Sequence, residues 1–531
     1  MLRSLGLFAA VATAITLAWF GWGRPVAIPP LPSPSSKLTC MSYTPFHGDQ
    51  APYTINLVIP DRQIEDDLKR LAQTTSCIRI YSARGAYGRV VRLAEKHGLE
   101  VLQGIWLNRN RAENRREIEV ALRLVRRHPE TIKALIVGNE TLLRGELSTE
   151  RIKSYLEEVR SRSGQPVTYA DVWEFWLKAP ELASATDFLT IHILPYWEDN
   201  PVPEATAVAH VREVHARIAD AFPGKKILIG EVGWPSRGRM REGTLPSPIN
   251  QARFVSGVMQ AAKAENWRVN FVEAFDQPWK RLLEGTVGGY WGLYDGPRRG
   301  PKFNFGGALS NHPDWRLKAG LGVGAAFLVF LAYRLGRTTR DASWSADLSC
   351  AAIALGSGLL FGLAAINLPI EGQIPGDRAR AVGLLVLALV VPMAAAYALA
   401  RGERLAGFAS ALNPSQWRGS HLATVGMAAL LAATVVAAIH VALGLSFDPR
   451  YKDFPVAALV GPVVGLAVLA GFADKANPRP GVAEIAVSLL LASAALFIVA
   501  NEGIANWQAL LLGGLLLLLA ATVLRAKAGP S

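Results

Sequence analysis

The sequence predicts an α/β protein, a (β/α)8 TIM barrel followed by an all-α polytopic membrane domain. Between Leu38 and Phe275, short apolar segments typical of strands alternate eight times with amphipathic stretches typical of helices, which is the pattern of a β/α barrel. From residue 316 onward the chain is mostly Ala, Leu, Val and Gly, and its apolar runs have the length that a helix needs to cross a bilayer. Half of all residues are hydrophobic and 19% are charged, which is less charge than a soluble protein of this size usually carries.

Four regions follow from this division of the chain. The apolar run near the N-terminus has the length of a signal peptide core. Trp19, Phe20 and Trp22 end it without a small-residue cleavage site, so an uncleaved anchor is the expectation. The prolines that follow favour a semi-rigid spacer. The regions are an N-terminal membrane anchor (1–23), a Pro-rich linker (24–37), the barrel (38–315) and a transmembrane domain of about seven helices (316–531).

The eight strand segments of the barrel can be located from their apolar and β-branched residues. They are residues 38–43, 77–81, 100–107, 132–140, 166–172, 187–194, 225–231 and 269–275. Amphipathic segments 61–73, 111–127 and 203–221 are among the helices between them. Because the active site of such a barrel lies at the carboxyl ends of its strands, the residues that end each segment are the candidates for a functional site.

Two of these segments end in a glutamate. The fourth ends in Gly138-Asn139-Glu140, and the seventh ends in Gly230-Glu231 before Val232-Gly233-Trp234-Pro235. Strands four and seven face each other across an eight-stranded barrel, so we expect Glu140 and Glu231 to flank one cleft. Cleavage of a glycosidic bond needs such a pair, and carboxyl groups about 5–5.5 Å apart give retention of configuration. The alternative, two unrelated surface carboxylates, does not account for the motifs around them.

These motifs resemble glycoside hydrolase family 17, the family of β-1,3-glucanases and β-glucanosyltransferases. The resemblance runs from about Thr39 to Asn304. One position departs from the family pattern, because Gln277 stands where the family often has Glu, and we expect this change to alter the polarity of the pocket. The motifs that carry the resemblance are, in order, Met41–Phe46, Ile78–Tyr81, Gly138–Glu140, Ile229–Ser236, Glu273–Lys280 and Trp291–Tyr294.

The resemblance implies a role for several residues. Glu140 would be the acid/base and Glu231 the nucleophile, Asn139 would bond the sugar 2-hydroxyl, and Lys280 would keep Glu231 ionised by its positive charge. Neither a cofactor nor a metal is implied, and the nine histidines show no metal-ligand spacing. Aromatic residues at or near strand ends are candidates for faces that bind sugar rings, with core packing as the alternative for each of them: Tyr81, Trp106, Tyr169, Trp173, Tyr196, Trp234, Phe275 and Trp279.

The three cysteines, Cys40, Cys77 and Cys350, show no metal-type spacing. Cys40 and Cys77 fall in neighbouring strand segments. A disulfide could join them in an oxidising compartment, but we expect two buried free thiols, because free cysteine commonly behaves as a small core hydrophobe.

Positive charge marks the ends of the apolar runs. The formal net charge is +13, but no basic cluster is interleaved with exposed aromatic residues, so no nucleic-acid partner is expected. A cytoplasmic N-terminus places eleven cations in cytoplasmic loops and four in short outer loops, as the positive-inside rule requires. The apolar runs lie near 317–335, 346–368, 381–400, 421–445, 455–473, 482–500 and 506–524. The cytoplasmic cations are Arg3, Arg334, Arg337, Arg340, Arg401, Arg404, Arg418, Lys475, Arg479, Arg525 and Lys527, and the outer ones are Arg378, Arg380, Arg450 and Lys452.

This orientation predicts a multi-pass protein of the bacterial inner (cytoplasmic) membrane, with residues 24–316 in the periplasm or outside the cell. Together with the family resemblance, it indicates a membrane-anchored retaining β-glucanosyltransferase that acts in the synthesis or remodelling of β-1,3-glucan, including β-1,6-branched or cyclic forms. The membrane tether favours transfer over degradation, since a degradative enzyme gains by being released. Bacterial membrane proteins of β-glucan synthesis are similar in this respect.

The expected partners are a β-glucan oligosaccharide or polysaccharide, the lipid bilayer and a membrane glucan synthase, because no nucleotide-sugar transferase motif is visible in the chain. Two other functions stay open, an endo-β-1,3-glucanase hydrolase and a non-catalytic glucan-binding membrane scaffold. The transmembrane helices themselves have two interpretations. They are an anchor or assembly platform, or they are a conduit or docking site for a growing glycan.

Overall fold

The structure is a computed structural model that describes residues 2–33, 37–337, 343–372, 374–412, 422–471 and 480–526. It divides into two compact units. The barrel unit comprises Val26–Gly238 and Gly243–Leu309, and the helical unit comprises Met1–Pro25, Arg239–Glu242 and Ser310–Ser531. Five of the cations used to predict the membrane orientation lie outside the described residues: Arg340, Arg418, Lys475, Arg479 and Lys527.

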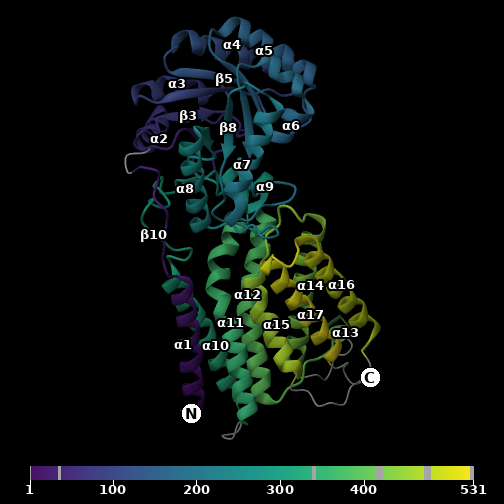
Figure 1. The fold of residues 1–531 in the computed structure, drawn as a ribbon. Coiled ribbons are helices and arrows are strands. Elements are labelled where there is room, and N and C mark those ends of the chain that lie inside the picture. Colours follow the sequence, from purple (N-terminus) through teal and green to yellow (C-terminus); the bar gives the residue numbers. More distant parts are fainter. Residues whose placement is uncertain are drawn as a thin grey trace. The chain divides into compact units, whose positions relative to one another are not determined.

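Eight parallel strands close into a barrel in the barrel unit (Figure 1). The last strand closes on the first through Met41 and Phe271. Each strand lies in, or within one residue of, a segment predicted from the sequence, so the predicted (β/α)8 barrel is confirmed. The strands are β2 (Met41–Ser42), β3 (Cys77–Ile80), β4 (Glu100–Ile105), β5 (Ile132–Asn139), β6 (Val167–Val172), β7 (Leu189–Ile193), β8 (Ile227–Val232) and β9 (Arg268–Phe271).

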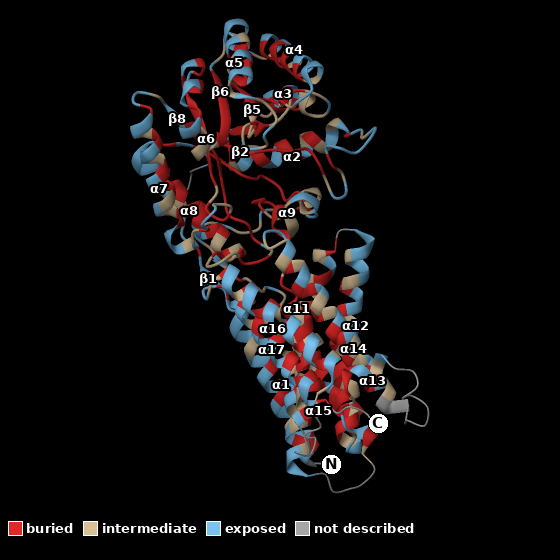
Figure 2. Cartoon of the chain, turned by 90° about the vertical axis from the view of Figure 1, so that its right-hand side faces the viewer, coloured by how far each residue is buried: buried red, intermediate tan, exposed pale blue. Residues whose placement is uncertain are grey.

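Helices follow the strands, and each buries one side and exposes the other, as the burial colours of Figure 2 show. Their ends carry recognisable signals. The side chain of Asn110 accepts hydrogen bonds from two backbone N–H groups of the first turn of α4, and Ser247 caps α8 ahead of Pro248, both of which stabilise a helix start. The larger helices are α2 (Asp61–Thr74), α3 (Tyr87–Lys96), α4 (Arg111–Arg127), α5 (Thr149–Ser163), α7 (Glu204–Ala221) and α8 (Pro248–Glu265). The shorter ones are α6 (Trp173–Lys178), η1 (Pro180–Ala185), η2 (Pro278–Lys280) and α9 (Arg281–Gly288).

The stretch expected to be a linker contributes a strand to the barrel unit. Val26–Ala27 (β1) pairs antiparallel with Ala308–Leu309 (β10), which lies some 280 residues later in the chain. Residues 34–36 of the expected linker lie outside the described part of the chain.

Side chains inside the barrel change from apolar to polar along the strands. Cys77 in β3 and Phe188 just before β7 belong to one buried apolar cluster. Alternate residues of a strand share a face, so Arg79 follows Cys77, and Thr190 and then His192 follow Phe188, on the same side. Arg79, Thr190 and His192 are buried. The strands therefore carry polar side chains in the interior toward their carboxyl ends.

Cys40 and Cys77 form a disulfide bond, so the expectation of two free thiols is wrong. Cys40 directly precedes β2 and Cys77 begins β3, and these strands pair through Met41 and Ile78. This pairing holds the two Cα atoms 4.5 Å apart, which is within the reach of a disulfide. Cys350, in the helical unit, is a buried free cysteine.

In the described part of the helical unit, seven helices are long and apolar enough to cross a membrane. The apolar run expected near 455–473 forms the shorter α15, which has 16 residues and contains Pro462. The long helices are α1 (Leu2–Trp22), α10 (Trp315–Gly336), α11 (Trp344–Glu371), α12 (Pro375–Arg401), α14 (Leu422–Phe447), α16 (Val482–Glu502) and α17 (Trp507–Arg525). The shorter ones are α13 (Phe408–Leu412) and α15 (Val456–Gly471).

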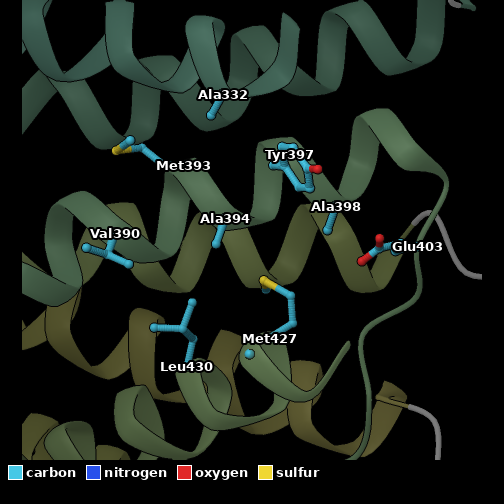
Figure 3. A pocket seen from close by; sticks show the side chains of 10 residues that line it. Ala332, Val390, Met393, Ala394, Tyr397, Ala398, Glu403, Met427 and Leu430 are labelled. Carbon is cyan, nitrogen blue, oxygen red and sulfur yellow. The ribbon is translucent and has the colours of Figure 1, made fainter. Parts of the chain in front are cut away.

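A cavity of about 400 Å³ lies among helices of this unit (Figure 3). Its wall is mainly apolar, with Val390, Met393 and Leu430 among the lining residues, and it has polar groups at Tyr397 and Glu403. Such a lining offers few groups for acid–base chemistry, so the candidate catalytic groups are those of the barrel.

Candidate active site

Glu140 and Glu231 lie at the carboxyl ends of β5 and β8. Glu140 directly follows β5, and its backbone N–H donates to the carbonyl of Ala170 on β6. Gly138 prepares this turn with a φ of +90°. A Cβ at Gly138 would lie 2.9 Å from the Thr141 hydroxyl and 3.1 Å from the Tyr169 ring, so only glycine fits here without displacing a neighbour.

Two side chains from β3 and its end hold the Glu231 carboxylate. The Arg79 guanidinium donates through Nη1 to Oε1 of Glu231 at 3.2 Å, and the Tyr81 hydroxyl donates to the same oxygen at 2.9 Å. Arg79 also donates to the carbonyl of Gly230 at 2.7 Å and to the side-chain oxygen of Asn139. This arrangement fixes one oxygen of the Glu231 carboxylate beside a buried positive charge.

The Glu140 carboxylate is held by a histidine from β7. Nδ1 of His192 lies 2.7 Å from Oε1 of Glu140, and the His192 side chain is fully buried. Burial raises the pKa of Glu140, but the hydrogen bond from His192 and the charges of Arg79 and Arg144 are among the causes that hold this pKa below its usual value. The two glutamates therefore sit in different surroundings, Glu140 beside a histidine and Glu231 beside an arginine and a tyrosine.

Glu140, His192 and Glu231 lie close together. One carboxylate oxygen of each glutamate and one ring nitrogen of the histidine lie within 4.8 Å of one another. An oxygen of one carboxylate therefore lies close to an oxygen of the other, nearer to the spacing of retaining than of inverting glycosidases. Among the described residues these three form the one group that could offer a metal three ligands. Nη1 of Arg79 lies 3.2 Å from both Nε2 of His192 and Oε1 of Glu231, so a buried positive charge opposes a cation there.

The carboxylate that Lys280 contacts directly is Glu273. The Lys280 ammonium donates to Glu273 at 2.7 Å, and Glu273 also accepts from the Thr44 hydroxyl at 2.7 Å. Lys280 lies in η2, beyond β9, where the buried Glu273 is its neighbour. The cation that contacts Glu231 directly is Arg79. Lys280 interacts with Glu231 through its charge, so its expected part in keeping Glu231 ionised stays a prediction.

The predicted aromatic residues divide into two groups. Tyr169, Tyr196, Trp234 and Phe275 are almost completely buried. Tyr169 donates to Asp171, and the Trp234 indole donates to the carbonyl of Leu245. These four rings pack in the core and present no open face, so core packing, the alternative stated for each, is their observed role.

The other predicted binding residues stay partly open or near the surface. Asn139 and Tyr81 are half-buried beside Arg79. The Trp106 ring carries the Arg144 guanidinium 4.1 Å above it, and Trp173 is nearly buried and donates to Glu198 at 3.3 Å. The Trp279 indole N–H donates a hydrogen bond to the side-chain oxygen of Gln277 at 2.9 Å. The amide of Gln277, the residue that departs from the family pattern, is therefore the hydrogen-bond acceptor for Trp279.

Sequence reasoning missed Arg79, His192 and Glu284 as parts of this site. Arg79 and His192 lie inside strand segments, and the available signal was a polar residue at alternate positions of an otherwise apolar strand. Glu284 comes from α9. Burial, together with the negative charges of Glu140, Glu273 and Glu231, raises the pKa of Glu284 to about 7, although Lys280 opposes this shift.

Comparison with known proteins found relatives of the barrel region. Residues 40–292 match the family model of the BtgE/BtgC glycoside hydrolase domain. The chain is 25% identical over 275 residues to a glucan 1,3-beta-glucosidase of Arthroderma benhamiae, covering 48% of this chain and 89% of that protein. It is 25% identical over 254 residues to a glucan 1,3-beta-glucosidase of Saccharomyces cerevisiae, covering 43% of this chain and 80% of that protein.

A further relative is a probable glucan endo-1,3-beta-glucosidase btgC of Aspergillus clavatus, 26% identical over 289 residues. The match covers 49% of this chain and 41% of that protein. Among solved structures, a glycoside hydrolase family 17 beta-1,3-glucanosyltransferase from Rhizomucor miehei is 22% identical, with a TM-score of 0.45, and covers 51% of this chain and 97% of that one. Within residues 40–292, this chain therefore carries a glycoside hydrolase domain that resembles the BtgE/BtgC type.

Proposed function

We propose that this chain is a membrane-anchored retaining β-glucanosyltransferase that acts on β-1,3-glucan during its synthesis or remodelling. The observation that carries the proposal is the close approach of Glu140 and Glu231 at the carboxyl end of a barrel that matches a glycoside hydrolase domain. The relatives named as glucan 1,3-beta-glucosidases support β-1,3-linked glucose as the substrate class. Branched and cyclic products are further forms of the same transfer.

In the first step, Glu231 attacks the anomeric carbon of the donor sugar. Both hydrogen bonds to Glu231 described above are made to Oε1, so we assign the attack to Oε2. A bond forms between Oε2 and the carbon, and the bond to the leaving oxygen breaks with its electron pair. Glu140 gives its proton to that oxygen, which departs as a hydroxyl of the released glucan.

In the second step, the acceptor resolves the glycosyl-enzyme. The hydroxyl oxygen of an acceptor attacks the same carbon, the bond to Glu231 breaks, and Glu140 takes the hydroxyl proton. Two successive displacements at one carbon give net retention. With a sugar as acceptor the result is transfer, and with water it is hydrolysis.

Transfer requires that an acceptor sugar be held where water would otherwise react. A positioned hydroxyl gains a large effective concentration over a free one. Trp279 is half-buried at the rim, and its ring contacts the edge of the exposed Tyr53 with centroids 6.0 Å apart. This pair, with Trp106 and Trp173, is the aromatic surface that we assign to glucan binding.

We place the barrel on the outer side of the bacterial inner membrane. The described helices are compatible with membrane spans, and the cations near their ends favour a cytoplasmic N-terminus. The Arg3 guanidinium lies 4.5 Å from the Trp344 ring, so the start of α1 and the start of α11 are at the same end of the helical unit. The Cys40–Cys77 disulfide suits the oxidising conditions outside the cytoplasm. A glucan synthase in the same membrane would supply the donor chain.

Hydrolysis is the second candidate function, and the names of the curated relatives favour it, since they are glucosidases. A non-catalytic glucan-binding scaffold is the third. It is disfavoured because both carboxylates and their hydrogen-bond partners are in place.

The length of the products separates these functions. The full-length chain in detergent is incubated with a β-1,3-linked glucose pentamer, and the products are separated by size. We expect products longer than the donor at high donor concentration. Only shorter products across a wide range of donor concentrations would support the hydrolase, and an unchanged donor would support the scaffold.

A variant tests the role of Glu231 directly. Glu231→Ala should abolish turnover and leave the barrel folded, because Arg79 keeps its hydrogen bonds to the Gly230 carbonyl and the Asn139 side chain when the carboxylate is removed. Azide, a small anion, should then fill the space of the missing carboxylate and form a glycosyl azide. Normal turnover in this variant would remove Glu231 from the nucleophile role.

A further inference from the structure

We propose that His192 is a positioning residue that sets the protonation of Glu140, and that Arg79 fixes His192 in the form this requires. The proposal rests on the proposed function, since it assigns Glu140 the acid/base role. His192 lies in strand β7, and its ring lies near both carboxylates. Under this proposal, the hydrogen bond between His192 and Glu140 determines how the activity depends on pH.

His192 stands between the two catalytic carboxylates. Its Nδ1 is 2.7 Å from Oε1 of Glu140, and its Nε2 is 3.7 Å from Oε1 of Glu231. Nε2 also lies 3.2 Å from Nη1 of Arg79. The imidazole is fully buried, so these neighbours, and not bulk water, determine where its proton lies.

The contact with Arg79 selects one tautomer of His192. A guanidinium can only donate hydrogen bonds, so Nε2 must accept and cannot carry a proton. The proton of the neutral ring therefore lies on Nδ1 and points at Glu140, which accepts it as a carboxylate. A doubly protonated ring would bring an N–H group and a second positive charge against Arg79, at a cost that burial increases.

Other charged and titratable groups surround Glu140 from several elements. Arg79 and Arg144 favour its ionised form. Asp171 and Glu284 interact with it as like charges, and Glu231 lies across the cleft. Tyr81 is bonded to Glu231, and Lys280 to Glu273. Like charges and burial oppose ionisation of Glu140, so the hydrogen bond from Nδ1 is a main reason that its pKa stays low.

The hydrogen bond from His192 affects the two steps of catalysis differently. The first step needs a proton on Glu140, and the second needs the free carboxylate. The hydrogen bond from His192 stabilises the carboxylate form of Glu140. As the pH rises, Glu140 therefore loses its proton at a lower pH than it would without this bond. Removing the bond should shift the alkaline limb of kcat/KM, which reports the free enzyme, to higher pH.

The test uses the full-length chain in detergent with the β-1,3-linked glucose pentamer. His192→Phe removes the donor, whereas His192→Asn keeps an amide N–H near the position of Nδ1. We expect the alkaline limb to move up by about one pH unit in H192F, the size expected for one hydrogen bond to a charged group, and to stay near that of the wild type in H192N. The matched control is His128→Phe, which removes a histidine whose Nδ1 lies 2.9 Å from Glu95 on outer helices, and it should not move the limb.

A second donor shows whether the shift acts through Glu140. A dinitrophenyl glycoside of a β-1,3-linked glucose dimer has a leaving group that departs without a proton, so H192F should not shift its alkaline limb. An equal shift with both donors would overturn the proposal, as would an unchanged limb in H192F with the pentamer. A wild-type limb above about pH 7, well over the ordinary glutamate value, would overturn it without any variant.

Failure of the proposed function gives a different result. If the wild type converts neither donor, the enzyme assignment itself is wrong. If the wild type converts both donors and the limbs do not follow these patterns, only the role of His192 is wrong.

Discussion

Arg79 links the parts of the candidate site. Its guanidinium contacts Glu231, His192 and Asn139, each from a different strand of the barrel. Its side chain is 1% exposed, so it places one buried positive charge beside Glu231. Because a buried charge is stable only with several hydrogen-bond partners, the same contacts that hold Glu231 also fix Arg79 itself.

Glu284 gives the site a pH-dependent contribution to stability. Burial raises its pKa to about 7 in the folded protein, above the value near 4.3 of an unfolded glutamate. A carboxyl group with a raised folded pKa stabilises the protein most below its unfolded pKa, and this stability is lost as the pH rises through the folded value. Its contribution should therefore decline between about pH 4 and pH 7.

We predict that Glu284→Gln removes this decline, because an amide does not titrate. The Tm of the variant, measured against that of the wild type, should rise between pH 5 and pH 7.5. The exposed Glu157 supplies a control, and Glu157→Gln should keep a constant difference from the wild type. An equally constant difference for E284Q would show that Glu284 does not titrate in this range.

Some residues of the candidate site could be predicted from the sequence and others could not. Glu140 and Glu231 were predictable because strand ends meet at one rim of a barrel. Arg79 and His192 were not predicted, since their roles depend on three strands converging inside the barrel. The direct contact of Lys280 with Glu273 was not predicted, because the path of the chain after β9 decides which carboxylate it meets.

At the scale of elements, periodicity located the strands and helices well. Segments 61–73, 111–127 and 203–221 correspond to α2, α4 and α7 within about one residue at each end. The short β2 was overestimated, because only Met41–Ser42 has strand geometry in the predicted segment 38–43. A pattern of apolar residues shows where a buried segment lies, but the hydrogen bonds of its neighbours decide where a strand begins and ends.

The disulfide joins Cys40 and Cys77, which lie in two strand segments that were predicted to be neighbours but not to be bonded. The two cysteines are 37 residues apart, and closing a loop of that length in the unfolded chain stabilises the fold by about 4 kcal/mol in the chain-entropy account. We predict that the double variant Cys40→Ser, Cys77→Ser lowers the Tm of the barrel by roughly 10 °C.

Reductant should lower the Tm of the wild type by a similar amount and leave that of the double variant unchanged. Cys350→Ala, which removes the free cysteine of α11, is the control and should keep the response to reductant. A wild-type Tm that is the same with and without reductant, together with a full count of free thiols, would contradict the disulfide.

For the whole molecule, the membrane orientation is the first question. We predict that α10 runs from the outside to the cytoplasm, because Arg334 and Arg337 are at its C-terminal end. Alkaline phosphatase, which is active only outside the cytoplasm, should be active when fused after Lys318 and inactive when fused after Arg337. The opposite pattern would place the barrel in the cytoplasm, where a disulfide is not expected to persist.

For the whole molecule, we propose that Glu140 and Glu231 act on β-1,3-glucan by two successive displacements. The most direct test is proton NMR of the anomeric region in the first minutes of reaction, before the product mutarotates, with the full-length chain and the β-1,3-linked glucose pentamer. We expect the new anomeric signals to be of the β form, because two inversions at one carbon restore the starting configuration. An initial product of the α form would contradict this proposal, since that requires a single displacement by water and leaves Glu231 without the role of nucleophile.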